Sequence, residues 1–326
     1  MRLALEAQEP YSLDLSLKPS FVSSMYIRNR TNSWIKIAGT LGGLLKLEQR
    51  SPRVVTATYR RDLGEAVIEL IRLETGLWHG PFEELVSSLP HRDLLEGLAR
   101  MYPGVRIPIA PHDFGCILLA TALSRRTSYE RFVLRWCRKI WNLYGCDPAI
   151  VSGLSREDLK AIGSSYQVLQ LKEILEDFRK INVDELRQLP PDIARLRLLS
   201  IRMLGPKAVD SLILSTFRAP YFIPCDTHLY RVASRLGFVE PGETCIPQKS
   251  LCSKYACTAS KSKITGAPPC PKSGNCIRAK LSWLGEAGGW FQTLAYIHGS
   301  KICRARRPLC SKCILKEPCQ YPLRSC

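Results

Sequence analysis

The sequence predicts a mostly helical α+β protein with a small antiparallel β-domain at its N-terminal end. Residues from about 10 to 60 alternate polar and apolar side chains around glycine-rich turns, which is typical of antiparallel strands. From about residue 63 onward, apolar side chains recur three and four positions apart in successive segments joined by short connections. This second pattern predicts an all-helical domain in which each helix buries one stripe.

The two patterns divide the 326 residues into four parts. We expect the β-domain over 1–62, a helical core over 63–240, an insertion over 241–282, and a terminal helix with a cysteine-rich loop over 283–326. The insertion follows neither period and is rich in Pro, Ser, Lys and Cys, so we expect a basic, flexible loop there.

The chain is strongly basic. Lys and Arg outnumber Asp and Glu by 47 to 29, which gives a formal charge of +18 and a sequence pI of about 9.5. This charge indicates a polyanionic partner, nucleic acid first, although a basic solvated surface would give the same count. No apolar run reaches ~18 residues, and the first residues, MRLALEAQEPYSLDL, do not have a signal-peptide pattern. We therefore expect an intracellular monomer, in the cytoplasm or nucleoid, without a membrane partner.

Fourteen cysteines are unexpected in a reducing compartment, where clustered cysteines more often bind metal than form disulfides. Four of them, called here the tail cysteines, have the spacing C-x6-C-x2-C-x5-C: Cys303, Cys310, Cys313 and Cys319. Four thiolates within 17 residues are enough to hold one metal centre. Zinc usually takes its ligands as two short knuckles, and only one is present; zinc and disulfides stay open as alternatives.

A tight turn followed by a helix start is predicted at Gly205-Pro206-Lys207, because glycine frees the backbone and proline suits the first helical position. The N-terminus of such a helix offers backbone N–H groups to a phosphate. Asp226 opens the next helical segment, with 18 residues between it and Lys207. Taken singly, Lys207 would be an ordinary first-turn lysine and Asp226 an ordinary N-cap.

Together these segments resemble the helix-hairpin-helix DNA glycosylases. The C-terminal part resembles endonuclease III, in which a His-Gly pair, here His298-Gly299, leads into a [4Fe-4S] cluster loop. The resemblance implies a [4Fe-4S] cluster on the tail cysteines. It places Lys207 on the catalytic lysine of the bifunctional members and Asp226 on the essential aspartate. The layout of the N-terminal part resembles 8-oxoguanine DNA glycosylase and 3-methyladenine DNA glycosylase II.

The resemblance implies a two-lobed fold and an enzyme of base excision repair. Such an enzyme acts on double-stranded DNA with a damaged base or abasic site, and we expect an oxidised purine such as 8-oxoguanine. Lys207 would form a Schiff base that leads to β-elimination, and Asp226 would stabilise the cationic sugar. Because only the neutral amine attacks, we expect Lys207 to be part-buried with a lowered pKa. Two alternatives stay open: a monofunctional glycosylase for an alkylated or oxidised base, with water activated by Asp226, and a non-catalytic lesion-binding protein.

The resemblance also assigns DNA contacts. Gly205 in the hairpin turn is expected to approach a phosphate, and so are three arginines between the tail cysteines: Arg304, Arg306 and Arg307. Arg125 stands where the family has Gln or Asn, so we expect it to enter the gap left by a flipped nucleotide or to bind phosphate. Met203 replaces the first glycine of the usual hairpin, and we expect the turn either to bend differently there or to hold a DNA phosphate less closely.

The insertion contains four further cysteines, called here the insertion cysteines, with the spacing C-x4-C-x12-C-x5-C: Cys252, Cys257, Cys270 and Cys276. Cys245 is near them in sequence. A second metal site, with zinc as the first candidate, and the disulfides of a thermophile both remain open. Because the segment is also rich in lysine, we expect it to touch DNA.

Overall fold

The computed structural model describes residues 1–59 and 64–321. An antiparallel sheet forms the N-terminal part, with the strand order β1-β5-β4-β3-β2. The strands are β1 (Arg2–Glu6), β2 (Tyr26–Arg28), β3 (Trp34–Lys36), β4 (Leu45–Ser51) and β5 (Val54–Tyr59). The predicted class, helical with a small antiparallel sheet, is confirmed.

Two details of the sheet differ from the pattern analysis. Strand β1 lies before the alternating region, and two short helices, α1 (Leu13–Leu17) and η1 (Phe21–Met25), interrupt that region. Both begin at serine caps: Ser12 accepts a hydrogen bond from the Leu15 amide, and Ser20 accepts one from the Val22 amide. The serine caps therefore favour short helices at these positions over the strands that the weak polar–apolar alternation predicts.

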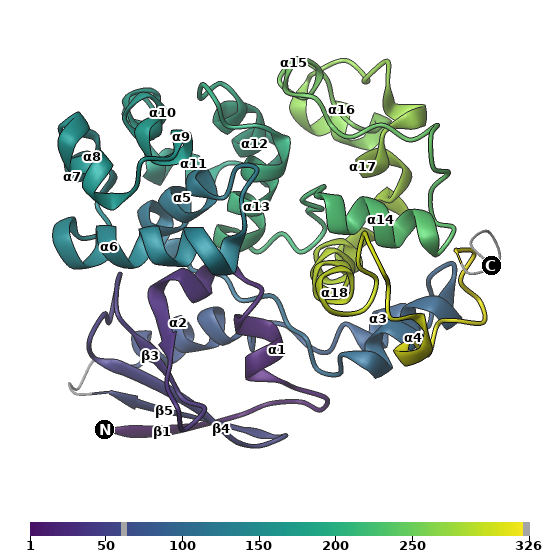
Figure 1. Cartoon of the computed structure of the whole chain (residues 1–326), viewed down its shortest axis with the longest axis horizontal. Helices are drawn as coiled ribbons and strands as arrows, with labels where there is room; N and C mark the ends of the chain where they lie inside the picture. Colours follow the sequence, from purple (N-terminus) through teal and green to yellow (C-terminus); the bar gives the residue numbers. More distant parts are fainter. Residues whose placement is uncertain (60–63, 322–326) are drawn as a thin grey trace.

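Alternation in the sheet separates a buried face from a solvated one. Leu45 and Leu47 on β4 pair directly with Tyr59 and Ala57 on β5, and all four are buried. Because successive strand residues point to opposite faces, the polar residues between them face away from this core. The helix α2 (Ala66–Thr75) lies beside the sheet (Figure 1).

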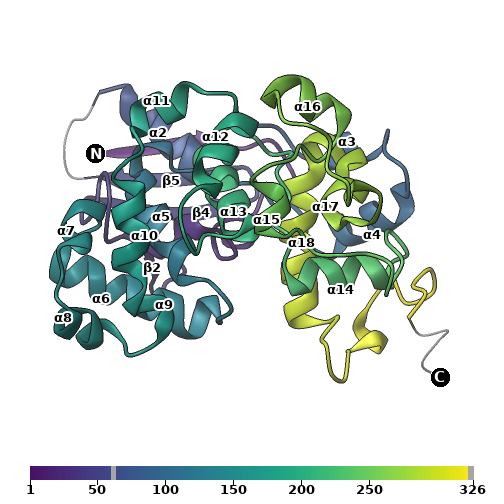
Figure 2. The ribbon, with the colours of Figure 1, turned by 90° about the horizontal axis from the view of Figure 1, so that it is seen from above.

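The remaining chain forms two helical lobes, which Figure 2 shows side by side. One lobe contains α5 (Phe114–Leu123), η3 (Tyr129–Val133), α6 (Leu134–Tyr144), α7 (Pro148–Ser152), α8 (Arg156–Ile162), α9 (Tyr166–Leu169), α10 (Leu171–Phe178), α11 (Val183–Gln188), α12 (Pro191–Leu199) and α13 (Pro206–Thr216). The other contains α3 (Glu83–Val86), α4 (Arg92–Met101), α14 (Thr227–Arg235), η5 (Ser282–Ala287), α18 (Gly288–Lys301) and η6 (Cys310–Lys312). Although α4 and α18 are far apart in sequence, they pack together.

Helix α5 lies at the centre of its lobe. Every residue of Phe114–Leu123 except Gly115 is buried, and the helix contacts α13 and α10. An α-helix without a polar stripe is buried on all sides, so this segment fixes the neighbouring helices around itself. Its C-terminal end presents Ser124. None of the helices described is long and apolar enough to cross a membrane.

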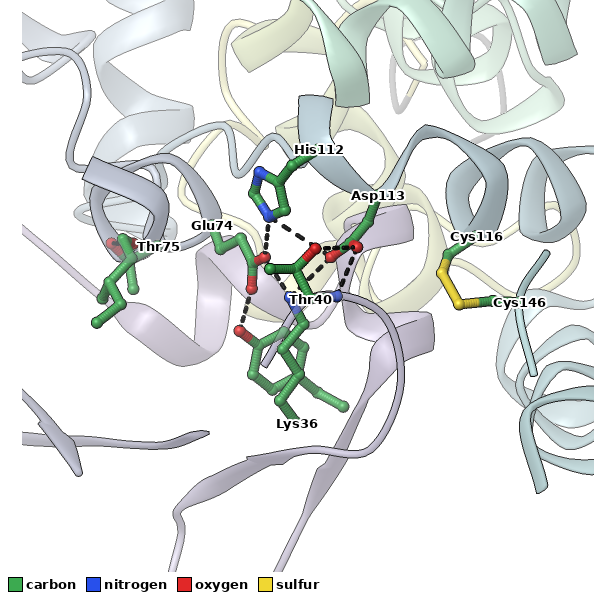
Figure 3. Close-up of polar contacts among 10 residues, drawn as sticks. Lys36, Thr40, Glu74, Thr75, His112, Asp113, Cys116 and Cys146 are labelled. Atoms are coloured by element: carbon green, nitrogen blue, oxygen red, sulfur yellow. Dashed lines mark hydrogen bonds and ion pairs between the residues drawn. A yellow bond between two sulfur atoms is a disulfide. The ribbon is translucent and has the colours of Figure 1, made fainter. Parts of the chain in front are cut away.

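An ionic cluster, defined by Lys36, Glu74, His112 and Asp113, joins the sheet to the helices (Figure 3). Lys36 Nζ lies 2.8 Å from Asp113 Oδ2 and also contacts Glu74 Oε1. The two carboxylates and His112 have the proximity of metal ligands, but the Lys36 ammonium already supplies the positive charge between the carboxylates. The cluster is therefore a structural link between β3, α2 and the start of α5, here preceded by η2 (Pro111–Asp113).

The insertion is folded, which corrects the expectation of a flexible loop. It contains α15 (Lys249–Cys252), α16 (Ala259–Thr265), η4 (Ser273–Asn275) and α17 (Ile277–Lys280). Both α15 and α16 contact α12, and Lys261 Nζ lies 2.6 Å from Asp192 Oδ2 on that helix. These elements are too short to show a period, and tertiary contacts hold them in place.

Candidate active site

The predicted hairpin is present between α12 and α13. Pro206 occupies the first turn of α13, and Gly205 is its N-cap with extended backbone (φ −91°). A side chain at Gly205 would meet nothing within 4 Å, so this turn presents open backbone. Met203 itself adopts a left-handed conformation (φ 61°). The turn therefore uses a positive φ without the usual glycine.

Lys207 is the second residue of α13 and is half-buried. Its Nζ donates to Ser124 Oγ at 3.2 Å and sits 5.2 Å from the centre of the Phe21 ring. Ser124 in turn donates to the Thr121 carbonyl oxygen at 2.8 Å, which leaves its oxygen free to accept from the amine. Burial lowers the pKa of Lys207, while the nearby Asp226 carboxylate opposes that shift. The side chain thus has the part-buried environment expected of an amine nucleophile.

Asp226 is the N-cap of α14, and its Oδ1 accepts from the Leu229 amide at 2.7 Å. Asp226 can cap α14 and interact with Lys207 at the same time, because the cap fixes its carboxylate at the end of α14 that faces the amine. The structure therefore brings Lys207 and Asp226 to one site from two separate helices. A nucleophile beside a carboxylate is an arrangement suited to attack on a cationic sugar.

Aromatic side chains surround this pair. Phe21 makes an edge contact with Tyr129, with ring centres 5.1 Å apart, and Tyr296 on α18 makes one with His228 at 5.2 Å. Burial, with Glu130 and Asp226 nearby, raises the pKa of Tyr296 to about 12, so its hydroxyl stays protonated. The site is thus walled by residues from η1, η3, α14 and α18, and it offers flat apolar surfaces near the amine.

The tail cysteines line a common cavity after α18, together with His298 and Arg235. Arg235 Nη1 donates to Cys303 Sγ at 3.2 Å, and Cys313 Sγ lies 3.7 Å from His298 Nε2. No three of these sulfur atoms lie within 4.8 Å of one another in the described chain. Four thiolates on one zinc ion would be about 3.8 Å apart, so the wider spacing fits a polynuclear centre, in which each thiolate binds a different metal.

Packing explains the His298-Gly299 pair that precedes the tail cysteines. His298 is buried and its Nδ1 is 3.1 Å from the Tyr102 hydroxyl, which joins α18 to the end of α4. A Cβ on Gly299 would come within 2.9 Å of His228 Nδ1. Glycine at this position therefore allows α14 and α18 to approach beside the candidate nucleophile site.

Comparison with known proteins gives relatives in sequence and in fold. No model of a known protein family matches the chain. Endonuclease III of Sulfolobus acidocaldarius is 31% identical over 134 residues, 40% of this chain and 48% of that protein. Endonuclease III of Thermotoga maritima is 24% identical over 208 residues, 63% of this chain and 82% of that protein. The chain thus spans about half the length of the first of these relatives.

A solved structure extends the likeness to the whole fold. The 8-oxoguanine glycosylase/lyase of Clostridium acetobutylicum, bound to double-stranded DNA, matches with a TM-score of 0.67 over 92% of this chain and 98% of that one, at 15% identity. The chain is similar in sequence to endonuclease III and has the fold of the helix-hairpin-helix DNA glycosylase superfamily. The hairpin α12–α13 is the element that gives the superfamily its name.

Arg125, the superfamily position expected to enter a DNA gap, is held within the protein in this structure. Its Nε donates to the Ala122 carbonyl at 2.7 Å, Nη1 to Gln170 Oε1 at 3.0 Å, and Nη2 to the Gln167 carbonyl at 3.3 Å. Its DNA role stays a prediction that requires these bonds to open. The three predicted arginines of the tail loop, Arg304, Arg306 and Arg307, are exposed.

Several residues of the candidate site were not found from the sequence: Phe21, Tyr129, His228 and Tyr296. They come from four separate elements and share no motif spacing, so only the tertiary fold brings them together. Ser124 lay within the segment singled out for Arg125, but its contact with Lys207 had no sequence signal.

Two further cysteine groups differ in outcome. Cys116 and Cys146 form a disulfide (Figure 3), although neither belongs to a spaced cysteine motif. The insertion cysteines are free thiols next to α12 and α13, and no three of their sulfur atoms lie within 4.8 Å of one another. Their proposed zinc therefore has no single-ion geometry in the described chain.

Proposed function

We propose that this protein is a DNA glycosylase with abasic-site lyase activity, acting on double-stranded DNA that contains a damaged base. The observation that carries the proposal is the half-buried Lys207, whose pKa is lowered by burial and which faces Asp226 directly after the hairpin. A lysine without a catalytic role at a helix start would normally keep its ammonium group in water, because burial of that charge costs free energy.

The proposed reaction uses these two side chains in turn. The neutral Lys207 amine attacks C1′ of the sugar, a C–N bond forms, and the bond to the damaged base breaks with the electron pair leaving on the base. Asp226 stabilises positive charge on the sugar as that bond opens. The attached nitrogen then gives up a proton, and its lone pair opens the C1′–O4′ bond as O4′ takes up a proton, which gives the iminium. The iminium loses a proton from C2′, and the C3′–O bond breaks with its electron pair leaving on the 3′ phosphate, which nicks the strand.

An oxidised purine, with 8-oxoguanine first, is the proposed substrate class. Phe21 supports this proposal, because it comes from the N-terminal part and its ring lies 5.2 Å from the Lys207 amine, so that part contributes to the surroundings of the amine. The matched glycosylase/lyase from Clostridium acetobutylicum is itself described with DNA containing 8-oxoguanine. Flat apolar walls suit a flipped purine, which stacks on aromatic rings.

The tail cysteines fit the [4Fe-4S] cluster that the superfamily resemblance implies, with Cys303, Cys310, Cys313 and Cys319 as ligands. When bound, the cluster would supply a rigid structural centre outside the bond chemistry. Arg304, Arg306 and Arg307 lie between the ligands and are exposed, so the chain itself would present them to DNA phosphates. Gly205 would bring backbone N–H groups of α13 to another phosphate.

Borohydride trapping tests the proposal. Purified protein is incubated with a duplex containing 8-oxoguanine opposite cytosine, and in parallel with an abasic duplex, and borohydride is added. We expect a covalent adduct with the wild type and none with Lys207→Gln. Lys139→Gln is the matched control, since Lys139 is an exposed lysine on α6 that donates to the Ala161 carbonyl.

The two duplexes separate the parts of the proposal. An adduct on the abasic duplex alone would keep the lyase and remove 8-oxoguanine as substrate. Base release without an adduct would replace the lysine mechanism by water activated at Asp226. Binding without either product, unchanged in Asp226→Asn, would overturn the enzyme proposal.

A further inference from the structure

Two buried arginines share one buried carboxylate behind the hairpin. Arg195 Nε on α12 lies 2.5 Å from Asp210 Oδ1 on α13, and Arg278 Nε on α17 lies 3.2 Å from Asp210 Oδ2. All three side chains are buried. Asp192, the other carboxylate that acts on Arg278, is already paired with Lys261 at 2.6 Å. The group therefore has an excess positive charge, which is unfavourable in a buried place unless an anion balances it.

Thiols are the groups next to this excess charge. Arg278 Nη1 donates to Cys257 Sγ at 2.7 Å, and Arg195 interacts with Cys252. Cys252 and Cys276 are each close enough to Cys257 to interact with it electrostatically. Thiol groups are therefore the side chains in contact with the two arginines beyond Asp210.

The backbone brings the fourth cysteine to the same place. A parallel bridge pairs Ala256 with Pro269, so the next residues, Cys257 and Cys270, stand side by side. The Cys270 amide donates to the Ala256 carbonyl at 2.8 Å, which fixes that register. Cys252 and Cys257 thus contact the buried arginines, Cys276 lies near Cys257, and Cys270 lies beside Cys257 along the backbone.

We propose that the insertion cysteines Cys252, Cys257, Cys270 and Cys276 hold a second polynuclear centre of the iron–sulfur class. Their spacing, like that of the tail cysteines, is wider than a single ion allows. A guanidinium donates to a sulfur in both places: Arg278 to Cys257, and Arg235 to Cys303. Four thiolates outweigh the positive charge of an iron–sulfur core, so the centre would balance Arg195 and Arg278.

This centre goes beyond the proposed glycosylase activity and does not depend on it. Its position gives it a structural consequence, because Asp210 and Lys207 lie on the same helix α13. By holding Arg195 and Arg278 against Asp210, the centre would fix α12 and α13 relative to the insertion. The insertion would thus act as a clamp on the hairpin.

Metal analysis tests the proposal. Protein purified without oxygen is assayed for iron, acid-labile sulfide and zinc per chain. We expect about eight iron atoms, against about four for one [4Fe-4S] cluster. Cys257→Ser/Cys270→Ser and Cys310→Ser/Cys313→Ser should each lose about half of the iron and keep the other cluster's absorption. Cys137→Ser, which changes a free buried cysteine on α6, should lose none.

Other results would overturn the second centre. These are about four irons that all disappear in the tail variant, one zinc per chain retained in that variant, or a disulfide between insertion cysteines found by mass spectrometry of unreduced peptides. Wild-type stoichiometry decides the matter even where a variant fails to fold. Hydrogen exchange adds a second readout: amides of α12 and α13 should exchange faster in Cys257→Ser/Cys270→Ser than in the tail variant.

Discussion

Met203 holds the hairpin turn in a backbone conformation that favours glycine. Its φ is 61°, and the side chain is half-buried against the core. For an L-residue other than glycine, the left-handed region costs about 1–2 kcal/mol. Packing of the Met203 side chain against the core offsets part of that strain.

A pair of truncations isolates the backbone strain at Met203. Both Met203→Ala and Met203→Gly remove the packing of the side chain, so their difference reflects the backbone. We expect the glycine variant to have the higher free energy of unfolding by about 1 kcal/mol, the reverse of the order in an ordinary helix. Urea denaturation of both variants measures this, and an alanine variant of equal or higher stability would contradict the left-handed turn.

The environment of Lys207 predicts how lyase activity depends on pH. Only the neutral amine attacks, so the trapping rate on an abasic duplex should rise with pH through the pKa of Lys207. Burial lowers that pKa, which places the midpoint below the ~10.4 of a free lysine. Because the Asp226 carboxylate opposes the shift, Asp226→Asn should move the midpoint to still lower pH.

A capping aspartate elsewhere provides the control for this profile. Asp147 caps α7 and accepts from the Ala149 amide at 2.8 Å, so Asp147→Asn changes a similar cap outside the site. Its midpoint should equal that of the wild type. A rate that is flat with pH, or an unchanged midpoint in Asp226→Asn, would mean that Lys207 does not limit the reaction in its neutral form.

Among the elements, β3, α2 and the start of α5 are joined through buried charge. Lys36 is buried between Glu74 and Asp113, and the Asp113 Oδ1 also accepts from Thr40 (Figure 3). Burial by itself raises the pKa of Glu74, but Lys36 and His112 outweigh it and hold that pKa below its usual range. Removal of Lys36 would leave two buried carboxylates without that counter-charge.

Lys36→Met should therefore lower the free energy of unfolding by about 3–5 kcal/mol at neutral pH. The wild-type contribution of Glu74 is complete above its unfolded pKa of ~4.3 and is lost as pH falls through the lower folded pKa. In the variant, burial dominates and raises the pKa of Glu74, so its deficit should shrink as pH falls from 7 to 5. Denaturation at both pH values measures this.

A lysine on the sheet surface is the matched control. Lys46 pairs with Glu48 at 2.6 Å on β4, with both side chains partly exposed, and Lys46→Met should change stability by less than about 1 kcal/mol. Equal effects of the two substitutions would show that the ionic cluster has no special role in holding the sheet to the helices.

At the scale of the whole molecule, the sequence predicted the fold class because the two periods change cleanly near residue 63. The resemblance to the helix-hairpin-helix glycosylases also singled out Lys207 and Asp226, which the fold brings together. It did not find Phe21 or Tyr296, since each reaches the site from a distant element without a motif. The insertion was missed for a related reason: its short helices are held by contacts such as Lys261 with Asp192.

The net charge of +18 makes a further prediction about the whole molecule. Cations that neutralise phosphates release counterions, so the logarithm of DNA affinity should fall steeply and linearly with the logarithm of salt concentration. If Arg304, Arg306 and Arg307 each contact a phosphate, changing all three to alanine should weaken binding and reduce the magnitude of that slope by about 3.

Fluorescence anisotropy of a labelled duplex between low and physiological salt measures both quantities. Three arginines of the β-domain, Arg2, Arg50 and Arg53, provide a control with the same change in net charge. Their replacement should leave the slope nearly unchanged, because only contacted phosphates release counterions to the protein. Equal slopes for the two triple variants would mean that the tail loop contributes general charge and does not contact the DNA backbone.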